Sequence, residues 1–380
     1  MADFLVAPTR RVHGCLGALL LALTLPAVLA QPSVPALKPG CLPADNQTDL
    51  FCPGARGVPP ALGDEVTKCW KIPSLLRTLR GTLLAFIEAR QAECGDGGLV
   101  DLKMRRSFDD GTTWDKSQYV VRNSPLSSVV ATFGDACPVL DRDTGRVHLV
   151  FTRNNADVYY TRSDDDGATW DRPRNISSMV SGHRSPGQFV GTGHAGGLQL
   201  RSGRLLIPLH GPCRMIYSDD RGDTWALAPG ALSKGGECQA VEIRPGVLLA
   251  SARNDDEGFT LLATSTDGGM TWNASVPSRG LPSPIKGVEA SLVAHPNGRL
   301  YHSAPDSFIL RERMVVRVSS DWGQTWGVHR VVWPSSAGYS SMVVMGHGRD
   351  APLGLLYDRN NVSMLVFEAR GVTFTLLPPS

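Results

Sequence analysis

Ser107-Phe-Asp-Asp-Gly-Thr-Thr-Trp114 is the first of five copies of one phrase, Ser-x-Asp-x-Gly-x-Thr-Trp. The other copies span residues 163–170, 218–225, 265–272 and 319–326, and their tryptophans lie 56, 55, 47 and 54 positions apart. A spacing this regular indicates one structural unit used repeatedly. The Asp and Ser side chains of each copy can bond nearby backbone N–H groups, and the Gly permits a positive φ. Each phrase therefore predicts a hairpin turn, with its Trp packed against a neighbouring unit.

The rest of the chain predicts β-structure around these turns. From Val66 onward, short apolar runs alternate with turn signals, and no stretch sustains an amphipathic helical period. Roughly 315 residues divided by a repeat near 54 give about six units, and four strands per unit suit a propeller blade. We therefore predict an all-β chain that folds as a six-bladed β-propeller over residues 66–380. Five phrases suffice for six units if one unit lacks the phrase or is closed jointly by both ends of the chain.

The N-terminus resembles a secretory leader. Arg10 and Arg11 precede an apolar run, Leu16–Ala30, with small residues at its end, which predicts a signal peptide over residues 1–30. A membrane anchor is the alternative, but the run is shorter than the roughly 20 residues that a span needs, and Pro26 interrupts it. We expect a Pro/Gly-rich arm at 31–65 and a soluble mature chain in the secretory pathway, either lysosomal or extracellular.

Charge and cysteine content narrow the possible partners. The formal net charge is +2, and nothing in its distribution argues for nucleic acid or for an anionic membrane surface. Seven cysteines follow the leader, without any metal-ligand spacing; disulfides are expected in an oxidising compartment, and the odd count leaves at least one thiol free or intermolecular. Sequons that fit a glycosylated secretory protein occur at Asn46, Asn175, Asn273 and Asn361.

Charged side chains and a tyrosine that interrupt apolar runs are the candidate functional residues. Burying a charge is costly unless it is paired or used, and the innermost strands of a propeller converge on its axis. Any one of these residues alone is more often a solvated strand end or a buried ion pair, but they recur once or twice per repeat. They are Lys71, Glu88, Arg90, Glu237, Arg253, Arg311, Tyr339 and Asp358.

At these residues the chain resembles the exo-α-sialidases. The five phrases are similar to that family's Asp boxes, and Trp70-Lys-Ile-Pro is similar to its N-terminal Arg-Ile-Pro motif. Leu83–Arg90, with Asp96 six residues on, is similar to the vertebrate lysosomal sialidase. The resemblance covers roughly residues 66–370. It implies a six-bladed propeller that removes terminal sialic acids from glycoproteins, glycolipids or oligosaccharides, with retention and without a cofactor. It indicates a sialylated glycoconjugate as substrate and names no protein partner.

The resemblance also implies catalytic roles: Tyr339 as nucleophile, Glu237 as its general base and Asp96 as the acid/base. A neutral phenol avoids the repulsion that a carboxylate would meet at an anomeric carbon already bearing one, and sialidases with a Tyr nucleophile are an exception to the two-carboxylate rule. Asp96 lies in a Gly-rich loop that can close over substrate. Rival residues are Asp101 for Asp96, Glu242 for Glu237, and Tyr217, Tyr301 and Tyr357 for Tyr339.

A cationic clamp for the sialic acid carboxylate is the second implication. Arg253 and Arg311 match two members of the family's arginine triad, and Arg90 matches a sugar-contacting position. Lys71 stands where the family has the first Arg, and Asp358 stands where it has the supporting Glu. Lys lacks the guanidinium fork, so the loss of one charge-assisted hydrogen bond predicts affinity roughly ten- to a hundredfold weaker. His194, in a glycine-rich stretch, stays outside the predicted catalytic set because a loop histidine bonded to backbone is commoner.

Three alternatives remain from the sequence. A related enzyme could prefer a deaminated sialic acid or transfer sialyl groups to an acceptor. A propeller lectin would bind sialosides without hydrolysing them, but binding alone does not need Tyr339, Glu237 and Asp96. A purely structural propeller explains none of the axis residues.

Overall fold

Antiparallel strands make up almost all of the regular structure in this computed structural model, which describes residues 47–52, 66–124, 129–183, 188–359 and 371–380. The one helical element among these residues is the 3-10 helix η1 (Ser177–Val180). None of their helices has the length and apolar character needed to cross a membrane. The predicted signal peptide at 1–30, together with Cys41, Asn46 and Asn361, lies outside the described residues.

Four sheets contain four strands each, hydrogen-bonded in chain order. The first sheet has β2 (Cys69–Arg77), β3 (Leu83–Arg90), β4 (Val100–Ser107) and β5 (Gln118–Val121). The second has β6 (Phe133–Leu140), β7 (Val147–Arg153), β8 (Asp157–Ser163) and β9 (Arg174–Asn175). The third has β10 (Leu198–Gln199), β11 (Leu205–Leu209), β12 (Arg214–Ser218) and β13 (Ala226–Ala231). The fourth has β14 (Cys238–Arg244), β15 (Val247–Ala252), β16 (Phe259–Ser265) and β17 (Val276–Pro282).

The fifth sheet has seven strands because one long strand continues from one group into the next. Its members, in spatial order, are β1 (Gln47–Phe51), β23 (Gly371–Leu377), β22 (Leu353–Arg359), β21 (Gly327–Val344), β20 (Glu312–Ser319), β19 (Leu300–Pro305) and β18 (Ser291–Ala294). The first part of β21, up to Ser336, pairs with β20, and the part from Ala337 onward pairs with β22. The all-β, propeller-like prediction is confirmed, with five hydrogen-bonded sheets rather than six separate ones.

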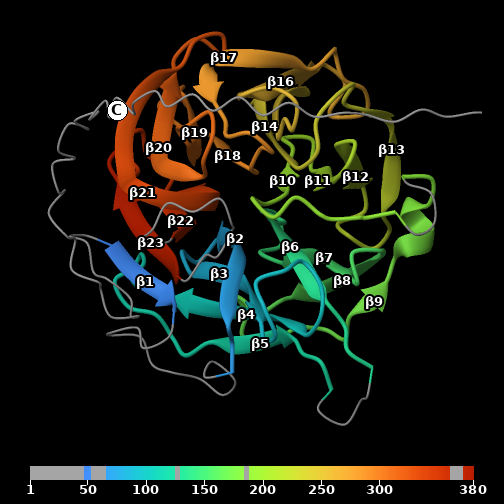
Figure 1. Cartoon of the computed structure of the whole chain (residues 1–380). Helices are drawn as coiled ribbons and strands as arrows, with labels where there is room; N and C mark the ends of the chain where they lie inside the picture. Colours follow the sequence, from blue (N-terminus) through green and yellow to red (C-terminus); the bar gives the residue numbers. More distant parts are fainter. Residues whose placement is uncertain (1–46, 53–65, 125–128, 184–187, 360–370) are drawn as a thin grey trace, which may run out of the picture. The chain divides into compact units, whose positions relative to one another are not determined.

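The sheets follow one another around a common centre in chain order (Figure 1). Within each four-stranded sheet the first strand lies nearest this centre and the fourth lies at the periphery (Figure 1). Apolar cores fill the spaces between successive sheets: Leu84 and Phe86 of β3, for example, pack with Leu149 and Phe151 of β7. Burial of both faces explains why so many strands are continuous apolar runs.

The segment predicted as a loosely held arm needs a correction at residues 47–51. These residues form β1, which pairs antiparallel with β23 near the other end of the chain. Arg359 of β22 donates a 2.6 Å hydrogen bond to Asp49, and both side chains are almost fully buried. The sequence around β1 shows no alternating pattern that would predict a strand. Its pairing could not be predicted either, because the partner strand is more than 300 residues away. The repeat count allowed one unit to be formed jointly by segments near both ends of the chain. The pairing of β1 with β23 is such an arrangement.

The five repeated phrases form the same turn at the end of the third strand of each group. In the first, Ser107 Oγ accepts a hydrogen bond from the Gly111 amide, and Asp109 accepts one from the Thr113 amide. The other four phrases repeat both bonds. Trp114 packs edge-on against Phe374 of the neighbouring strand β23, as predicted for a wedge between units.

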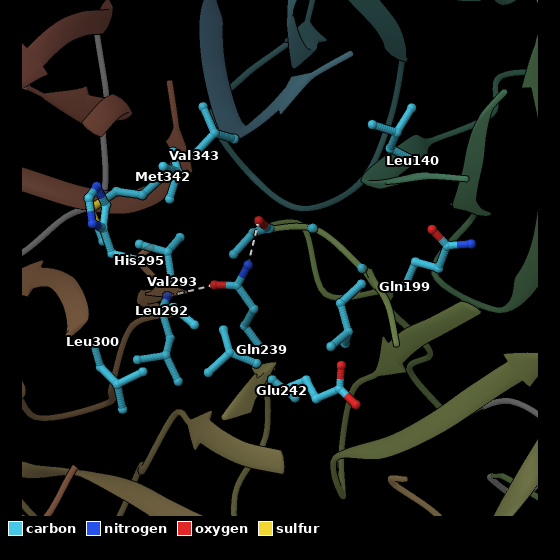
Figure 2. A pocket seen from close by; sticks show the side chains of 18 of the residues that line it. Leu140, Gln199, Gln239, Glu242, Leu292, Val293, His295, Leu300, Met342 and Val343 are labelled. Carbon is cyan, nitrogen blue, oxygen red and sulfur yellow. Dashed lines mark hydrogen bonds between the residues drawn. The ribbon is translucent and has the colours of Figure 1, made fainter. Parts of the chain in front are cut away.

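Side chains from several innermost strands are hydrogen-bonded to one another at the centre. Gln239 of β14 donates to the Ala195 carbonyl and accepts from the Leu292 amide of β18 (Figure 2). Ser341 of β21 donates to the same Ala195 carbonyl and accepts from the Leu75 amide of β2. These bonds fix the inner strands relative to one another. The mostly apolar cavity of about 640 Å³ shown in Figure 2 lies beside this network and includes none of the predicted site residues.

Candidate active site

The predicted site residues meet because they occupy the same end of successive antiparallel strands. Arg90 ends β3, Arg253 directly follows β15, Glu237 directly precedes β14 and Arg311 directly precedes β20. In an antiparallel sheet the start of the first strand, the end of the second and the start of the third share one edge. The repeated phrases follow the third strand, so they lie at the opposite edge. This geometry separates the turns that shape the fold from the polar side chains.

Three innermost strands bulge where they reach this edge. The pairing shifts register between Lys71 and Ser74 in β2 and between Ala337 and Ser340 in β21, and β6 shifts beside Asp135. Bulges are common beside active sites because they re-aim side chains out of the regular pleat. At Gly338 an added Cβ would lie 2.5 Å from an Asp358 oxygen, so only glycine leaves room for that carboxyl next to Tyr339.

Tyr339, Glu237 and Arg253 form one hydrogen-bonded group. Tyr339 Oη donates to Glu237 Oε1 at 2.8 Å. Arg253 Nη1 donates both to Glu237 Oε2 at 3.0 Å and to Tyr339 Oη at 3.1 Å. Asp255 and the Lys286 carbonyl hold the remaining nitrogens of the same guanidinium. A phenol, a carboxylate and a fixed cation are thus within direct contact.

Burial and charge set the protonation states of this group. Burial by itself would raise the pKa of Glu237, but the charge of Arg253 is the largest opposing effect, and the pKa is lowered to about 2. Burial, and then the Glu237 charge, raises the pKa of Tyr339 well above its usual value. The resting state therefore contains a neutral phenol hydrogen-bonded to an ionised carboxylate. That is the arrangement of a nucleophile beside its base.

Arg90 connects the loop that carries Asp96 to the interior. Its Nη2 donates to Glu88 at 2.6 Å, and its Nη1 donates to Asp96 at 2.8 Å and to the Cys94 and Gly95 carbonyls. The side chain of Arg90 is 3 % exposed, whereas that of Asp96 is 76 % exposed. Asp96 is therefore held at the rim of the site by a buried arginine.

Lys71, Arg311 and Asp358 lie next to this group rather than in it. The Arg311 guanidinium stacks over the Tyr339 ring at 4.9 Å and donates to the Gly287 carbonyl. Burial, with Arg90 next, lowers the pKa of Lys71, and Asp358 opposes the shift. Burial raises the pKa of Asp358, against the charges of Lys71 and Arg311. The two residues that depart from the family pattern are therefore electrostatic partners.

A cavity of about 250 Å³ brings six of the predicted residues to one surface: Glu88, Arg90, Asp96, Glu237, Arg253 and Tyr339. It is smaller than the apolar cavity in Figure 2, but it is the one lined by the predicted site residues. Lys71, Arg311 and Asp358 do not line it directly.

The rival residues lie elsewhere. Asp101 is buried in β4, where it accepts hydrogen bonds from Gln91 and Asn123. Glu242 bonds the Arg201 and Gly246 amides and lines the apolar cavity. Two of the rival tyrosines already use their hydroxyl groups in hydrogen bonds: Tyr301 with Asn297 and Ser380, and Tyr357 with Gln47. The ring of the third, Tyr217, is stacked under Arg204.

Several acidic and imidazole groups around the cavity received no role from the sequence. Asp135 and His210 line it, and Glu88 bonds the Asp135 amide. Glu289 lies 2.7 Å from His194, whose ring contacts that of Tyr339. The sequence did contain a signal for these residues. Like the predicted residues, Asp135, His210 and Glu289 interrupt or end apolar runs, so a search for polar side chains in every apolar run would have included them.

Two disulfides flank the predicted catalytic residues. Cys69–Cys94 joins the start of β2 to the loop two residues before Asp96, and Cys213–Cys238 ends directly beside Glu237. Cys52 is also disulfide-bonded, whereas Cys137 is free and buried. The expectation of disulfides with at least one free thiol is thereby confirmed.

Comparison with known families gives a match over most of this fold. Residues 81–351 match the model of the BNR repeat-like domain. A sialidase of Micromonospora viridifaciens is 31% identical over 362 residues, covering 84% of this chain and 53% of that protein. Sialidase-3 of Rattus norvegicus is 31% identical over 284 residues, covering 63% of this chain and 65% of that protein. The chain thus spans about half to two thirds of the length of these relatives.

Solved structures give the same fold. The Hadza microbial sialidase Hz136 superposes with a TM-score of 0.73 at 25% identity, covering 83% of this chain and 67% of that one. The intramolecular trans-sialidase from Ruminococcus gnavus, in complex with oseltamivir carboxylate, superposes with a TM-score of 0.71 at 18% identity, covering 88% and 98%. At that identity the second likeness concerns the fold alone.

Proposed function

The chain belongs to the BNR repeat-like domain family, and on that premise we propose that it is a retaining exo-α-sialidase, a glycoside hydrolase that removes terminal sialic acids from glycoconjugates. The observation that carries the proposal is the 2.8 Å hydrogen bond from Tyr339 to Glu237 inside a cavity that Arg253 also lines. Its relatives named sialidase support the same reaction class.

The propeller is best counted as six blades on this proposal. The seven-stranded sheet divides at the middle of β21 into two groups, β18 to β21 and β21 with β22, β23 and β1. Together with the four separate sheets this gives six groups of four strands. The five repeated turns then correspond to Asp boxes, and the blade that β1 completes is the one without a box.

In the proposed first step, Tyr339 attacks the anomeric carbon while its phenolic proton passes to Glu237. The oxygen-to-carbon bond that forms yields a sialyl-tyrosine intermediate, and the bond to the leaving oxygen breaks as Asp96 protonates that oxygen. In the second step Asp96 takes a proton from water, which attacks the same carbon and releases Tyr339, and the departing phenol oxygen recovers its proton from Glu237. Two displacements at one carbon give retention.

Arg253 links substrate binding to the strength of the base. In the free enzyme its charge holds the pKa of Glu237 low, to about 2. A substrate carboxylate that bonds Arg253 would draw this cation away from Glu237, and the pKa of Glu237 would rise. Glu237 would then become the stronger base at the moment when Tyr339 must lose its proton.

The clamp for the substrate carboxylate would comprise Arg253 and Arg311, with Lys71 as a point charge behind them. Arg311 already stacks on the Tyr339 ring, so a carboxylate between the two guanidinium groups lies beside the nucleophile. Arg90 acts differently, since its nitrogens hold Glu88 and Asp96. We therefore assign Arg90 mainly to positioning the acid/base.

The direct test is turnover of a fluorogenic α-sialoside by the purified chain. We expect release of sialic acid by the wild type and a loss of roughly 100-fold or more in Tyr339→Phe, because the phenol oxygen is the nucleophile. Tyr217→Phe is the matched control, since Tyr217 lies outside the cavity and should retain full activity. A fully active Tyr339→Phe enzyme would contradict the nucleophile assignment.

Two other functions use the same cavity. As the second candidate, an enzyme on this fold could transfer the sialyl group to a hydroxyl other than that of water, as the trans-sialidase of similar fold is named for doing, or could prefer a deaminated sialic acid. Product analysis by mass spectrometry across several sialic acids separates these from hydrolysis. Sialoside binding without any turnover in mildly acidic or neutral buffer would instead identify a lectin.

We further propose that the protein works in the secretory pathway, in a lysosome or outside the cell, as lysosomal-type sialidases do. The disulfides Cys69–Cys94 and Cys213–Cys238 support this location, because such bonds persist mainly in oxidising compartments. Trimming of the leader after Ala30 and sugar on Asn175 or Asn273 are the features to measure, by mass spectrometry of the protein secreted from animal cells. An untrimmed, unglycosylated chain would contradict the proposal.

A further inference from the structure

A cluster of two histidines and a glutamate lies behind the catalytic tyrosine. His194, His210 and Glu289 come from the glycine-rich segment before β10, the end of β11 and the residues just before β18. Their side chains are 0 %, 4 % and 1 % exposed. One ligand atom of each lies within 4.8 Å of those of the other two. Nothing in the proposed hydrolysis uses these three side chains.

The polar atoms of this cluster are unpartnered in a way that buried groups seldom are. Both ring nitrogens of His194, both of His210, and Glu289 Oε2 have no hydrogen-bond partner among the described residues. His194 Nε2 does lie 2.7 Å from Glu289 Oε2, but the alignment is not that of a hydrogen bond. A buried polar group without a partner is destabilising, so five such atoms converging at one point need an explanation.

We propose that His194, His210 and Glu289 form a binding site for a divalent transition metal of the zinc type. Two imidazole nitrogens and one carboxylate oxygen are a common three-residue zinc ligand set, and they leave one coordination position for water. In a tetrahedral zinc site, ligand atoms about 2.1 Å from the metal lie about 3.4 Å from one another. The distances from Glu289 Oε2 to His194 Nε2 and His210 Nε2, 2.7 and 3.8 Å, bracket that spacing.

The charges around the cluster also favour a cation. Neutral imidazole is the form of histidine that binds a metal, and the ring nitrogens of His194 and His210 have no hydrogen-bond partner among the described residues. Glu237 is close enough to Glu289 for their charges to interact. A metal ion would offset the repulsion between these two carboxylates.

The surrounding backbone leaves room for the site. An added Cβ at Gly191 would lie 2.3 Å from His210 Nδ1, so the glycine is what permits the ring to sit there. His210 also lines the 250 Å³ cavity, beside the Phe189 ring stacked on it. His210 therefore lies between the cluster and the cavity.

The test measures metal binding directly, so it does not depend on the proposed sialidase activity. The purified full chain, freed of metal with a chelator, is titrated with ZnCl₂ by calorimetry at neutral pH. We expect one Zn²⁺ per chain and at least tenfold weaker binding in His194→Gln and in His210→Gln. His302→Gln is the matched control, because His302 is equally buried but bonds Ser251 in another part of the chain. No saturable binding, or equal affinity in the cluster variants, overturns the proposal.

X-ray absorption of the zinc-loaded wild type keeps the proposal testable if a variant fails to fold. We expect two imidazoles and oxygen donors with no sulfur. The competing ligand nearby is Cys137, a buried free thiol. Burial raises the pKa of this thiol, and the charge of Glu289 raises it further. A sulfur donor in the spectrum would place the metal at Cys137 and overturn the His194–His210–Glu289 assignment.

Discussion

Lys71 stands beside Asp358 where the family has Arg and Glu, and both side chains are almost fully buried. Burial lowers the pKa of Lys71 and raises that of Asp358, so it disfavours the charged form of each side chain. A lysine in this position contributes a point charge without a fork to the proposed carboxylate clamp. An arginine keeps its charge when buried and adds a fork.

We therefore expect Lys71→Arg to lower KM for a sialoside by roughly tenfold while kcat changes less, since one charge-assisted hydrogen bond is regained. Steady-state kinetics on a fluorogenic α-sialoside checks this. Arg77→Lys, at the far end of β2 and outside the cavity, is the control and should leave KM unchanged. An unchanged or higher KM in Lys71→Arg would mean that Lys71 and Asp358 recognise a different head group.

His302 illustrates how a single buried group makes stability depend on pH. Burial, with Arg317 next, lowers its pKa from 6.5 to about 3. The folded state therefore resists protonation that the unfolded chain accepts, so stability is complete above about pH 6.5 and falls as the pH drops toward 3. Two pH units below the unfolded pKa the loss amounts to about 2.7 kcal/mol.

His302→Gln should remove this contribution. We expect the difference in free energy of unfolding between pH 7 and pH 4.5 to be smaller in the variant than in the wild type by about 2.5 kcal/mol. Urea unfolding at the two pH values measures it. His329→Gln, at a half-buried ring, serves as control, and equal pH dependence in wild type and His302→Gln would contradict the assignment.

At the level of elements, the site depends on loops that covalent bonds and bulges hold in place. Asp96 is in a loop between β3 and β4, with its side chain in solvent, yet Cys94 ties that loop to β2 and Arg90 bonds three of its oxygens. The loop therefore has two independent anchors. Rigid support of this kind keeps a catalytic group within reach of substrate.

Replacing Cys69 and Cys94 together by Ser should lower both stability and turnover. The bond closes a segment of 25 residues, so its loss is expected to cost about 3 kcal/mol of unfolding free energy. We expect kcat/KM to fall several-fold because the acid/base is held less firmly. Denaturant unfolding and turnover measure the two effects, with Cys137→Ser as a control that leaves both disulfides intact. Wild-type turnover in the double variant would show that Arg90 alone positions Asp96.

At the scale of the whole molecule, the propeller is closed by β1 against β23. Asp49 lies between Arg359 and Thr373, at 2.6 Å from an Arg359 nitrogen. Arg359 also stacks on Trp333, so the same cation joins three strands. Removal of one partner from a buried charge pair usually costs more than the pair itself contributes.

Asp49→Ala should therefore lower the free energy of unfolding by about 3 kcal/mol. Asp164→Ala, which removes an ion pair to Arg146 with a 60 % exposed carboxylate, should cost less than about 1 kcal/mol. Guanidinium unfolding followed by tryptophan fluorescence compares the two. Similar costs would indicate that β1 does not close the propeller cooperatively.

The repeat length, the turn phrase and the apolar runs are local features, and they were enough to predict an all-β, propeller-like chain, whereas the set of site residues also needed the resemblance to sialidases. Turn chemistry depends on a few adjacent residues, so Ser107, Asp109 and Gly111 specify their hairpin wherever they occur. A charge such as Arg253 beside an apolar run is equally visible without a structure.

Contacts between distant segments could not be predicted in this way. The pairing of β1 with β23, the continuity of β21 between two groups of strands and the partners of Cys94 and Cys238 depend on which segments the ring brings together. The same holds for His194, His210 and Glu289, which lie up to 95 positions apart and look ordinary one at a time. Only tertiary packing, which buries all three together and leaves five of their polar atoms without hydrogen-bond partners among the described residues, makes them a candidate site.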